Sequence, residues 1–268
     1  MKIMIVGHGF VGSAVSYAFS GIETFIVDPK YGTTIPSNIH QYDAIFVCVP
    51  TPMGNDGSID DTILNSVLEK VEGHSLCVVK STVTPDVLNR YYNIVYNPEF
   101  LTEKSASEQF VAAKFHILGG DWRKTESLER LYKEYSLCNH ADFYHMTTAE
   151  ASFVKYTINS FLAMKVTFFN QIYDAAQDAG VNFSKIIKGV AADDRIGHSH
   201  TKVPGFDGKQ GYGGACFPKD TAAFANYSNK LTLLEKCIMI NNEYRLQYEL
   251  DEREIEQNVN YGQAKKEQ

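Results

Sequence analysis

Short apolar segments alternate with amphipathic segments through the first half of the chain. The apolar segments are rich in β-branched residues and predict strands over 2–6, 24–27, 44–49, 76–79, 94–96 and 113–118. Apolar residues recur at helical spacing over 11–19 and 62–71. Strands that alternate with helices form a parallel sheet with helices on both faces and right-handed crossovers. We therefore predict that residues 1–146 form a Rossmann-type domain with a doubly wound, mostly parallel α/β sheet.

The pattern changes near residue 147. Thr147 can cap a helix N-terminus, and Glu150 adds negative charge to the first turn of that helix. No proline or glycine interrupts 149–179, and Gly180 ends the segment, so we predict one long helix of about 30 residues. Apolar side chains lie on several sides of this helix. Such a helix is typically buried between domains or between subunits.

The rest of the chain is predicted to be helical apart from one loop. Residues 184–190 predict a short helix, whereas the Gly- and His-rich segment 196–214 predicts a functional loop. The pattern from 219 to about 258 is helical, and 262–268 is expected to fray. We expect residues 147–268 to form a helical domain whose long helix and C-terminal helix bury apolar surface in a homodimer.

The composition is that of an ordinary globular protein. The 268 residues are 44% hydrophobic and 21% charged, with a formal net charge of −7. An acidic chain without a basic segment is a poor candidate for binding nucleic acid, so we expect no such partner. No stretch of about 18 apolar residues occurs, which predicts a soluble, cytoplasmic protein without a membrane segment.

The cysteines and histidines show no disulfide or metal pattern. The five cysteines are odd in number, widely spaced and without a CxxC pair, which favours a reducing compartment. His198 and His200 lie two residues apart in a loop, unlike the HExxH spacing of a zinc site. We therefore expect no metal.

A glycine motif follows the first predicted strand and begins the first predicted helix. Residues 7–12 read Gly-His-Gly-Phe-Val-Gly, the GxGxxG spacing that lets backbone approach a pyrophosphate at a helix N-terminus. Asp28 ends the next strand about 20 residues later, where a carboxylate can bind ribose hydroxyls and repel a 2′-phosphate. The alternative is a glycine turn that serves packing only. The expected NAD contacts are Gly7, Gly9, Phe10, Val11, Gly12 and Asp28.

A single cysteine lies in a loop of small residues. Cys216 follows Gly213, Gly214 and Ala215, so backbone there can approach a ligand closely. Lys219 and Asp220 are close in sequence, and a nearby cation can raise the thiolate fraction of a cysteine. From the residues alone, two interpretations remain: a nucleophile, or a small buried hydrophobic residue.

Polar residues form a stripe on the long predicted helix. Lys155 and Asn159 are four residues apart and share a face, and Asn170 returns to nearly the same direction. Buried polar side chains need partners. The stripe therefore indicates either part of a functional site or ion pairs to an acid such as Glu99 or Glu103.

Polar residues also follow several predicted strands. Residues 97–103 contain the carboxylates of Glu99 and Glu103, residues 80–82 read Lys-Ser-Thr, and 49–52 read Val-Pro-Thr-Pro. Open α/β sheets bind ligands at the carboxyl ends of their strands. These segments together are stronger evidence for a site than any one of them.

Taken in order, these motifs resemble the UDP-glucose/GDP-mannose dehydrogenase family. The resemblance runs from residue 2 to about 245 and is most specific in 97–103, 150–159, 194–197 and 213–220. It implies NAD-dependent four-electron oxidation of a nucleotide sugar at C6, UDP-glucose to UDP-glucuronate being favoured, as a step of polysaccharide biosynthesis. Cys216 would form a thiohemiacetal and then a thioester, which water hydrolyses.

The resemblance also implies roles for individual residues. Lys155 and Asn159 would stabilise negative charge on oxygen, Glu99 would act as a general base, and Asp220 with Thr82 would activate water. The implied catalytic residues are Cys216, Lys155, Asn159, Asp220, Glu99 and Thr82. Beyond the glycine motif and Asp28, the implied cofactor contacts are Lys30, Val49, Pro50, Thr51, Thr82, Glu103 and Lys219. The implied substrate contacts are Glu99, Phe100, Leu101, Lys155, Asn159, Arg195, Lys202, Tyr212 and Gly213, with Arg195 reaching across a subunit boundary.

The sequence departs from the family pattern in two main places. Family members usually carry a third, nucleotide-binding domain, so we expect a short form without it. Only about 15 residues separate Asp28 from the next predicted strand, so the sheet near the adenosine end of NAD is expected to be trimmed. Three alternatives remain: another sugar such as UDP-N-acetyl-mannosamine or GDP-mannose, a single oxidation as in β-hydroxyacid dehydrogenases, and a non-catalytic protein that binds NAD or a nucleotide sugar.

Overall fold

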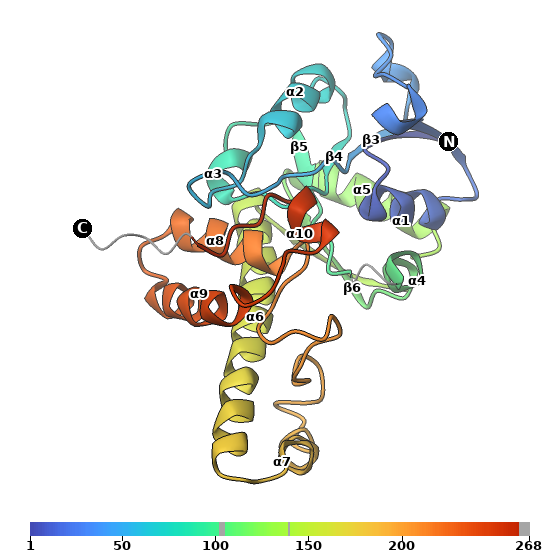
Figure 1. Cartoon of the computed structure of the whole chain (residues 1–268). Helices are drawn as coiled ribbons and strands as arrows, with labels where there is room; N and C mark the ends of the chain where they lie inside the picture. Colours follow the sequence, from blue (N-terminus) through green and yellow to red (C-terminus); the bar gives the residue numbers. More distant parts are fainter. Residues whose placement is uncertain (102–104, 139, 263–268) are drawn as a thin grey trace. The chain divides into compact units, whose positions relative to one another are not determined.

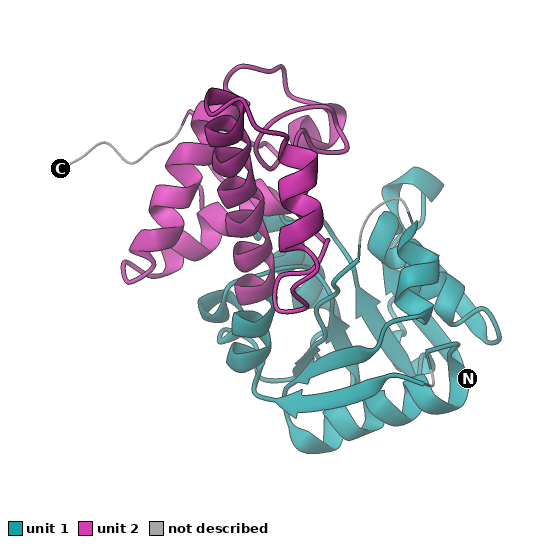
Figure 2. Cartoon of the chain, turned by 90° about the horizontal axis from the view of Figure 1, so that it is seen from below, with its two compact units in different colours: residues 1–51, 60–155 teal, residues 52–59, 156–268 magenta. Residues whose placement is uncertain are grey.

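The computed structural model describes residues 1–101, 105–138 and 140–262. The chain divides into two compact units, coloured separately in Figure 2. Unit 1 consists of Met1–Thr51 and Asp60–Lys155, and unit 2 consists of Pro52–Ile59 and Tyr156–Gln268.

A seven-stranded sheet forms the centre of unit 1, in the order β2-β1-β3-β4-β5-β6-β7 (Figure 1). Every pairing is parallel except β5 with β6, which is antiparallel. The predicted mostly parallel, doubly wound sheet is therefore confirmed. The strands are β1 (Lys2–Val6), β2 (Glu23–Val27), β3 (Ala44–Val47), β4 (Cys77–Val79), β5 (Ile94–Tyr96), β6 (Phe115–Gly119) and β7 (Asp142–Met146).

Helices bury the apolar side chains of this sheet. One core cluster joins Ile3 and Phe46 of the sheet to Val15 of α1, Phe110 of α4 and Leu128 of α5. Strand residues that point the other way, such as Met4 and Ile45, are also fully buried, as expected for strands with two covered faces. The helices of unit 1 are α1 (Phe10–Ala18), α2 (Thr62–Val71), α3 (Pro85–Leu88), α4 (Ala106–Val111) and α5 (Trp122–Tyr135), with short 3₁₀ turns at η1 (Pro29–Tyr31) and η2 (Ile39–Gln41).

Among the described residues, only one strand, β2, lies beyond β1 at one side of the sheet, which agrees with the trimmed sheet that the sequence predicted. Between β2 and β3 the described chain forms only the two 3₁₀ turns η1 and η2. The strands β2 and β3 lie on opposite sides of β1. The direction in which strands are added to the sheet therefore reverses between β1 and β3. In doubly wound sheets such a reversal opens a crevice at the carboxyl ends of the strands.

Unit 2 is helical. It contains most of α6 (Thr148–Asp178), then α7 (Phe183–Val190), α8 (Phe217–Tyr227), α9 (Thr232–Arg245) and α10 (Glu252–Glu256). The long predicted helix and the loop over 196–214 are confirmed. The helical region predicted from 219 to about 258 consists of three separate helices. Extended backbone at Ser228 ends α8, and a capping box at Asp251 begins α10.

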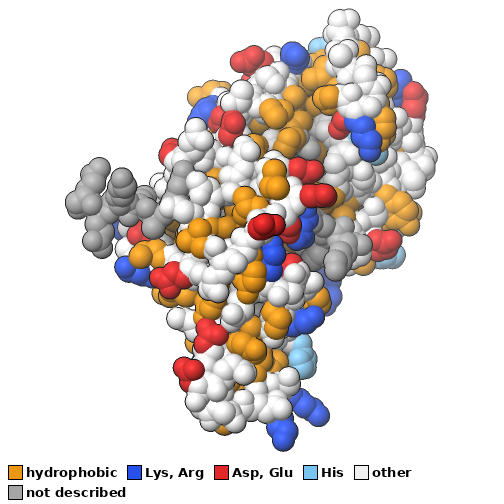
Figure 3. All heavy atoms as spheres, viewed as in Figure 1, with side chains coloured by type: hydrophobic (Ala, Val, Ile, Leu, Met, Phe, Trp, Pro, Cys, Tyr) orange, Lys and Arg blue, Asp and Glu red, His pale blue; other side chains and the backbone are white. Residues whose placement is uncertain are grey.

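Large apolar side chains remain at the surface of unit 2. Phe161 and Phe168 of α6 are 64% and 56% exposed. Hydrophobic, acidic and basic side chains are interspersed over the face of the molecule drawn in Figure 3. The homodimer stays a prediction, and it would give these exposed aromatic side chains an apolar surface to pack against.

None of the helices in the described residues is long and apolar enough to cross a membrane.

Candidate functional site

The glycine motif forms a tight turn between β1 and α1. Gly7 has a φ of +89°, and a Cβ there would lie 2.6 Å from the carbonyl oxygen of Cys48, just after β3. A Cβ on Gly12 would lie 2.0 Å from the carbonyl oxygen of Gly7, so α1 packs directly on the turn. A Cβ on Gly9 would meet nothing within 4 Å. Backbone is therefore open to a ligand at Gly9, while the outer two glycines are required for packing.

Asp28 lies beside this turn. Its Oδ2 accepts the backbone N–H of His8 at 2.7 Å, and its Oδ1 accepts that of Lys30 at 2.8 Å. The hydrogen bond from His8 and that from Lys30 lower the pKa of the Asp28 carboxyl. The group is thus a carboxylate with lone pairs left for ribose hydroxyls. Lys30 itself is exposed, with its Nζ 5.9 Å from the Tyr31 ring centre.

The segments that follow β3 and β4 are joined by side-chain hydrogen bonds. Thr51 donates its hydroxyl to the Thr82 carbonyl at 2.8 Å, and Ser81 donates to the Val49 carbonyl at 2.6 Å. These contacts hold the expected cofactor residues after the two strands, with Pro50 exposed beside them. The sequence placed these residues at strand ends, and the structure brings those ends together.

Lys155 and Glu99 form a buried ion pair in unit 1. The Lys155 Nζ lies 3.3 Å from Glu99 Oε1 and donates to the Glu99 carbonyl at 2.6 Å. The second carboxylate oxygen accepts the N–H of Leu101 at 2.5 Å, and the Phe100 ring lies 5.4 Å from the ammonium group. This pair is one of the two interpretations that the polar stripe allowed. Glu103, the other acid considered, lies outside the described residues.

A second lysine, Lys80, is also buried, and its burial was not predicted from the sequence. Lys80 follows β4, is 1% exposed, and donates to both the carbonyl oxygen and the Oδ1 of Asn97 at 3.0 and 2.9 Å. Tyr132 also donates to this Oδ1, at 2.7 Å. Burial is the main cause that lowers the pKa of Lys80, to about 8. The feature of the sequence that could have indicated this burial is the position of the lysine directly after a fully apolar strand.

In unit 2, Cys216 is the N-cap residue of α8 and is half-buried. One turn into the helix, Asp220 is 1% exposed and accepts hydrogen bonds from two side chains. Asn159 Nδ2 donates to its Oδ2 at 2.6 Å, and Lys219 Nζ lies 2.7 Å from its Oδ1. A helix N-terminus favours negative charge, so the sulfur lies where an anion is stabilised.

Side-chain amides of α6 and α9 hold the backbone of the loop before Cys216. Asn241 of α9 accepts the Tyr212 N–H at 2.6 Å and donates to the Tyr212 carbonyl at 3.0 Å. Asn170 of α6 accepts the Gly211 N–H at 3.0 Å. A Cβ on Gly213 would lie 2.4 Å from side-chain atoms of Arg245, so only glycine fits there.

Two predicted substrate residues are exposed. The Arg195 guanidinium pairs with Asp193, whose hydrogen bonds raise the pKa of Arg195. Lys202 lies with its Nζ 4.6 Å from the Phe206 ring centre. Neither of these contacts, to Asp193 and to Phe206, reaches residues 211–216, and the substrate roles of both side chains remain predictions.

Both halves of the chain match one protein family. Residues 30–136 match the NAD binding domain of the UDP-glucose/GDP-mannose dehydrogenase family, and 149–243 match the central domain of the same family. The chain belongs to this family. The resemblance of the sequence motifs is thus confirmed, and the NAD-binding match confirms the predicted cofactor. The match begins after the glycine motif, whose own geometry fits NAD: backbone open at Gly9 and an ionised Asp28 beside it.

Relatives in this family include UDP-glucose 6-dehydrogenases. That of Campylobacter jejuni is 31% identical and covers 92% of this chain and 73% of its own length. That of Rickettsia prowazekii is 34% identical and covers 74% of this chain and 48% of its own length. The chain thus spans about half the length of several curated relatives that it matches.

Solved structures of the family share the fold. A UDP-glucose dehydrogenase from Pyrobaculum islandicum superposes with a TM-score of 0.76 at 26% identity, covering 90% of this chain and 68% of the other. A UDP-D-ManNAc dehydrogenase from Pyrococcus horikoshii gives a TM-score of 0.77 at 19% identity, covering 91% and 69%. The second shows the fold alone.

Proposed function

We propose that this chain oxidises the C6 hydroxyl of a nucleotide sugar to a carboxylate in two NAD-dependent steps, with UDP-glucose as substrate and UDP-glucuronate as product. One observation carries the proposal: Cys216 begins α8, with the buried Asp220 held one turn later by Asn159 and Lys219. A single oxidation of an alcohol needs no thiol, whereas a thiol allows oxidation to an acid through a covalently bound aldehyde. The relatives named UDP-glucose 6-dehydrogenase support the choice of sugar.

Bound NAD supplies the hydride acceptor in both oxidations. In unit 1, the open backbone at Gly9 would face the pyrophosphate and the Asp28 carboxylate the ribose hydroxyls. The expected contacts after β3 and β4, Thr51 and Thr82, are held by their shared hydrogen bond.

In the proposed mechanism, Cys216 forms the covalent bonds to the substrate, and charged side chains assist the transfer of protons. The Cys216 sulfur adds to the C6 aldehyde, and the aldehyde oxygen takes up a proton, giving a thiohemiacetal. Its oxidation leaves a thioester. Water then adds to the thioester carbon, the C–S bond breaks, and the thiol and carboxylic acid are released. A covalent adduct keeps the reactive aldehyde from escaping between the two oxidations.

Charged side chains support these steps. Asp220 accepts hydrogen bonds from Asn159 and Lys219, which hold its carboxyl group in one orientation, and it is the proposed acceptor of a proton from water. Lys155 carries the cation that stabilises negative charge on oxygen, and Glu99, its partner, is the proposed base for the C6 hydroxyl. The proposed substrate contacts of Phe100, Leu101, Tyr212 and Gly213 are through backbone.

The proposal is tested by absorbance at 340 nm with excess NAD and limiting UDP-glucose. Two NADH per sugar are expected, and none from the Cys216→Ser variant. A ratio of one, or an unchanged rate in that variant, would refute the thioester route. The same assay over a panel with UDP-N-acetyl-mannosamine and GDP-mannose decides the sugar. NAD binding without turnover of any member would refute the enzyme proposal in favour of a binding protein.

A further inference from the structure

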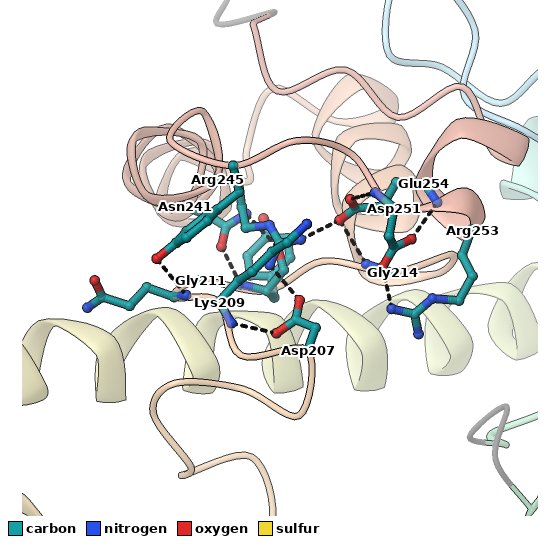
Figure 4. Close-up of polar contacts among 12 residues, drawn as sticks. Asp207, Lys209, Gly211, Gly214, Asn241, Arg245, Asp251, Arg253 and Glu254 are labelled. Atoms are coloured by element: carbon teal, nitrogen blue, oxygen red, sulfur yellow. Dashed lines mark hydrogen bonds and ion pairs between the residues drawn. The ribbon is translucent and has the colours of Figure 1, made fainter.

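The chain after α9 turns back onto the loop that precedes Cys216. Figure 4 shows the loop residues Asp207, Lys209, Gly211 and Gly214 facing Arg245 of α9 and residues of α10. A capping box between Asp251 and Glu254 fixes the start of α10. All of these residues belong to unit 2.

Glu254 is the centre of this contact. It is completely buried, and its Oε1 accepts hydrogen bonds from the Gly214 N–H at 3.1 Å, from Arg245 at 2.7 Å and from the Tyr261 hydroxyl at 2.6 Å. Its Oε2 accepts the backbone N–H of Asp251 at 2.9 Å. One carboxylate therefore joins the loop backbone, the end of α9 and the C-terminal segment.

Arg245 adds a second attachment. Its guanidinium, 1% exposed, also donates to the carboxylate of Asp207, which lies nine residues before Cys216 in the same loop, at 2.7 Å. The loop is thus held at Asp207 by an ion pair with Arg245, and at Gly214 by a hydrogen bond to Glu254, which itself pairs with Arg245. The backbone at Gly213 lies directly on that pair, because a Cβ there would be 2.4 Å from both Arg245 and Glu254.

A buried ion pair of this kind is weak evidence for stability. The desolvation of two charges offsets most of their attraction, and apolar replacements of similar volume are often neutral for folding. What apolar side chains cannot replace is the acceptor for the Gly214 N–H, two residues before Cys216. The contact that distinguishes this pair is therefore its hydrogen bond to the loop backbone at Gly214.

We propose that Glu254 and Arg245 are positioning residues, which fix Gly213 and Gly214 and thereby the Cys216 sulfur at the start of α8. The proposal rests on the proposed function, in which Cys216 is the nucleophile. A shift of the loop by about 1 Å would then reduce turnover strongly, since attack needs the sulfur within near-contact distance of the aldehyde carbon.

The test compares three variants in the full chain. The double variant Arg245→Met/Glu254→Leu replaces the ion pair by apolar side chains and removes the acceptor for Gly214. Glu254→Gln keeps an acceptor oxygen, and Glu252→Leu changes an exposed neighbour on α10 as a control. Alkylation of Cys216 by iodoacetamide is followed against pH by peptide mass spectrometry, together with kcat, KM and Tm.

For the double variant, we expect a cooperative melt, a change of about fivefold or more in the alkylation profile, and a fall of about tenfold in kcat with KM for NAD unchanged. Glu254→Gln and Glu252→Leu should stay within about twofold of the parent chain in both readouts. A double variant with the parent alkylation profile and kcat would overturn the proposal. So would equal loss in Glu254→Gln, which retains the acceptor.

One measurement on the unaltered chain does not depend on how the variants fold. Hydrogen exchange of the Gly214 amide should be slowed by about 100-fold or more relative to an unstructured peptide, because it is bonded to a buried carboxylate. Rapid exchange would overturn the proposal. Exchange and alkylation need no substrate, so a chain that oxidises no nucleotide sugar would refute the proposed function while these readouts still decide the role of Glu254 and Arg245.

Discussion

The buried Lys80 makes the stability of this protein depend on pH in a direction that can be calculated. Its pKa is about 8 in the folded chain, against about 10.4 in an unfolded one. Between these values the unfolded chain binds more protons than the folded chain, so the free energy of unfolding rises with pH. The cost of the buried ammonium group, about 3 kcal/mol, is fully present below pH 8 and lost as pH approaches 10.4.

Lys80→Met isolates this effect. Burial raises the pKa of the Cys48 and Cys77 thiols to about 12, and these groups act in the opposite direction. Lys80 lowers the pKa of Cys48, so its removal raises that pKa further, and both folded thiols stay protonated up to pH 9.5 in either protein. Their contributions therefore cancel in the difference. Urea denaturation at pH 7 to 9.5 should show the parent chain gaining about 2 kcal/mol relative to Lys80→Met.

A control separates burial from the loss of a positive charge. Lys70 is exposed on α2, so Lys70→Met removes a charge that water already solvates. Its difference from the parent chain should not change with pH. A flat or falling difference for Lys80→Met would show that the Lys80 ammonium is stabilised in the fold as well as it is in water, and would refute the reasoning.

The remaining predictions concern the NAD site. Gly12→Ala should lower both Tm and NAD affinity, because its Cβ would lie 2.0 Å from the Gly7 carbonyl, whereas Gly9→Ala should leave Tm unchanged and weaken NAD alone. Thermal melts with and without NAD measure both effects, and equal losses of Tm would contradict the packing argument. Asp28→Asn should reduce the preference for NAD over NADP by about tenfold, because a neutral side chain no longer repels a 2′-phosphate. Titration with both cofactors measures the ratio, and an unchanged ratio would exclude Asp28 from the ribose contact.

The elements that the sequence predicted most accurately are those with a continuous or regularly spaced run of apolar residues. The strands β1 and β5 and the helix α2 were predicted with their observed bounds, because both faces of the strands are buried and the helix has a regular apolar stripe. β7 and α5 were not predicted. β7 is an edge strand with exposed polar positions, and α5 buries only a narrow stripe, so neither has a long apolar run.

The candidate site divides in the same way. Residues inside local motifs, such as the glycines, Asp28 and Cys216, could be proposed from the sequence because spacing along the chain constrains their geometry. Their partners were missed. Gly214 and Glu254 are forty residues apart, and no periodicity in the sequence connects them. Contacts between residues so far apart in the sequence depend on how helices and loops pack against one another, and this packing cannot be read from one sequence alone.

Four buried polar contacts in the described residues lie at or near the ends of strands and helices. Each involves a residue that follows a strand or lies in the first or last turn of a helix, and none of these residues belongs to the apolar clusters of either unit. Since such groups add little net stability, a fold selected for stability alone would replace them with apolar side chains. Their positions indicate that each fixes a segment with a proposed chemical role, which is why variants that keep stability and lose activity are the informative ones. The contacts in question are Lys80 with Asn97, Lys155 with Glu99, Lys219 with Asp220, and Arg245 with Glu254.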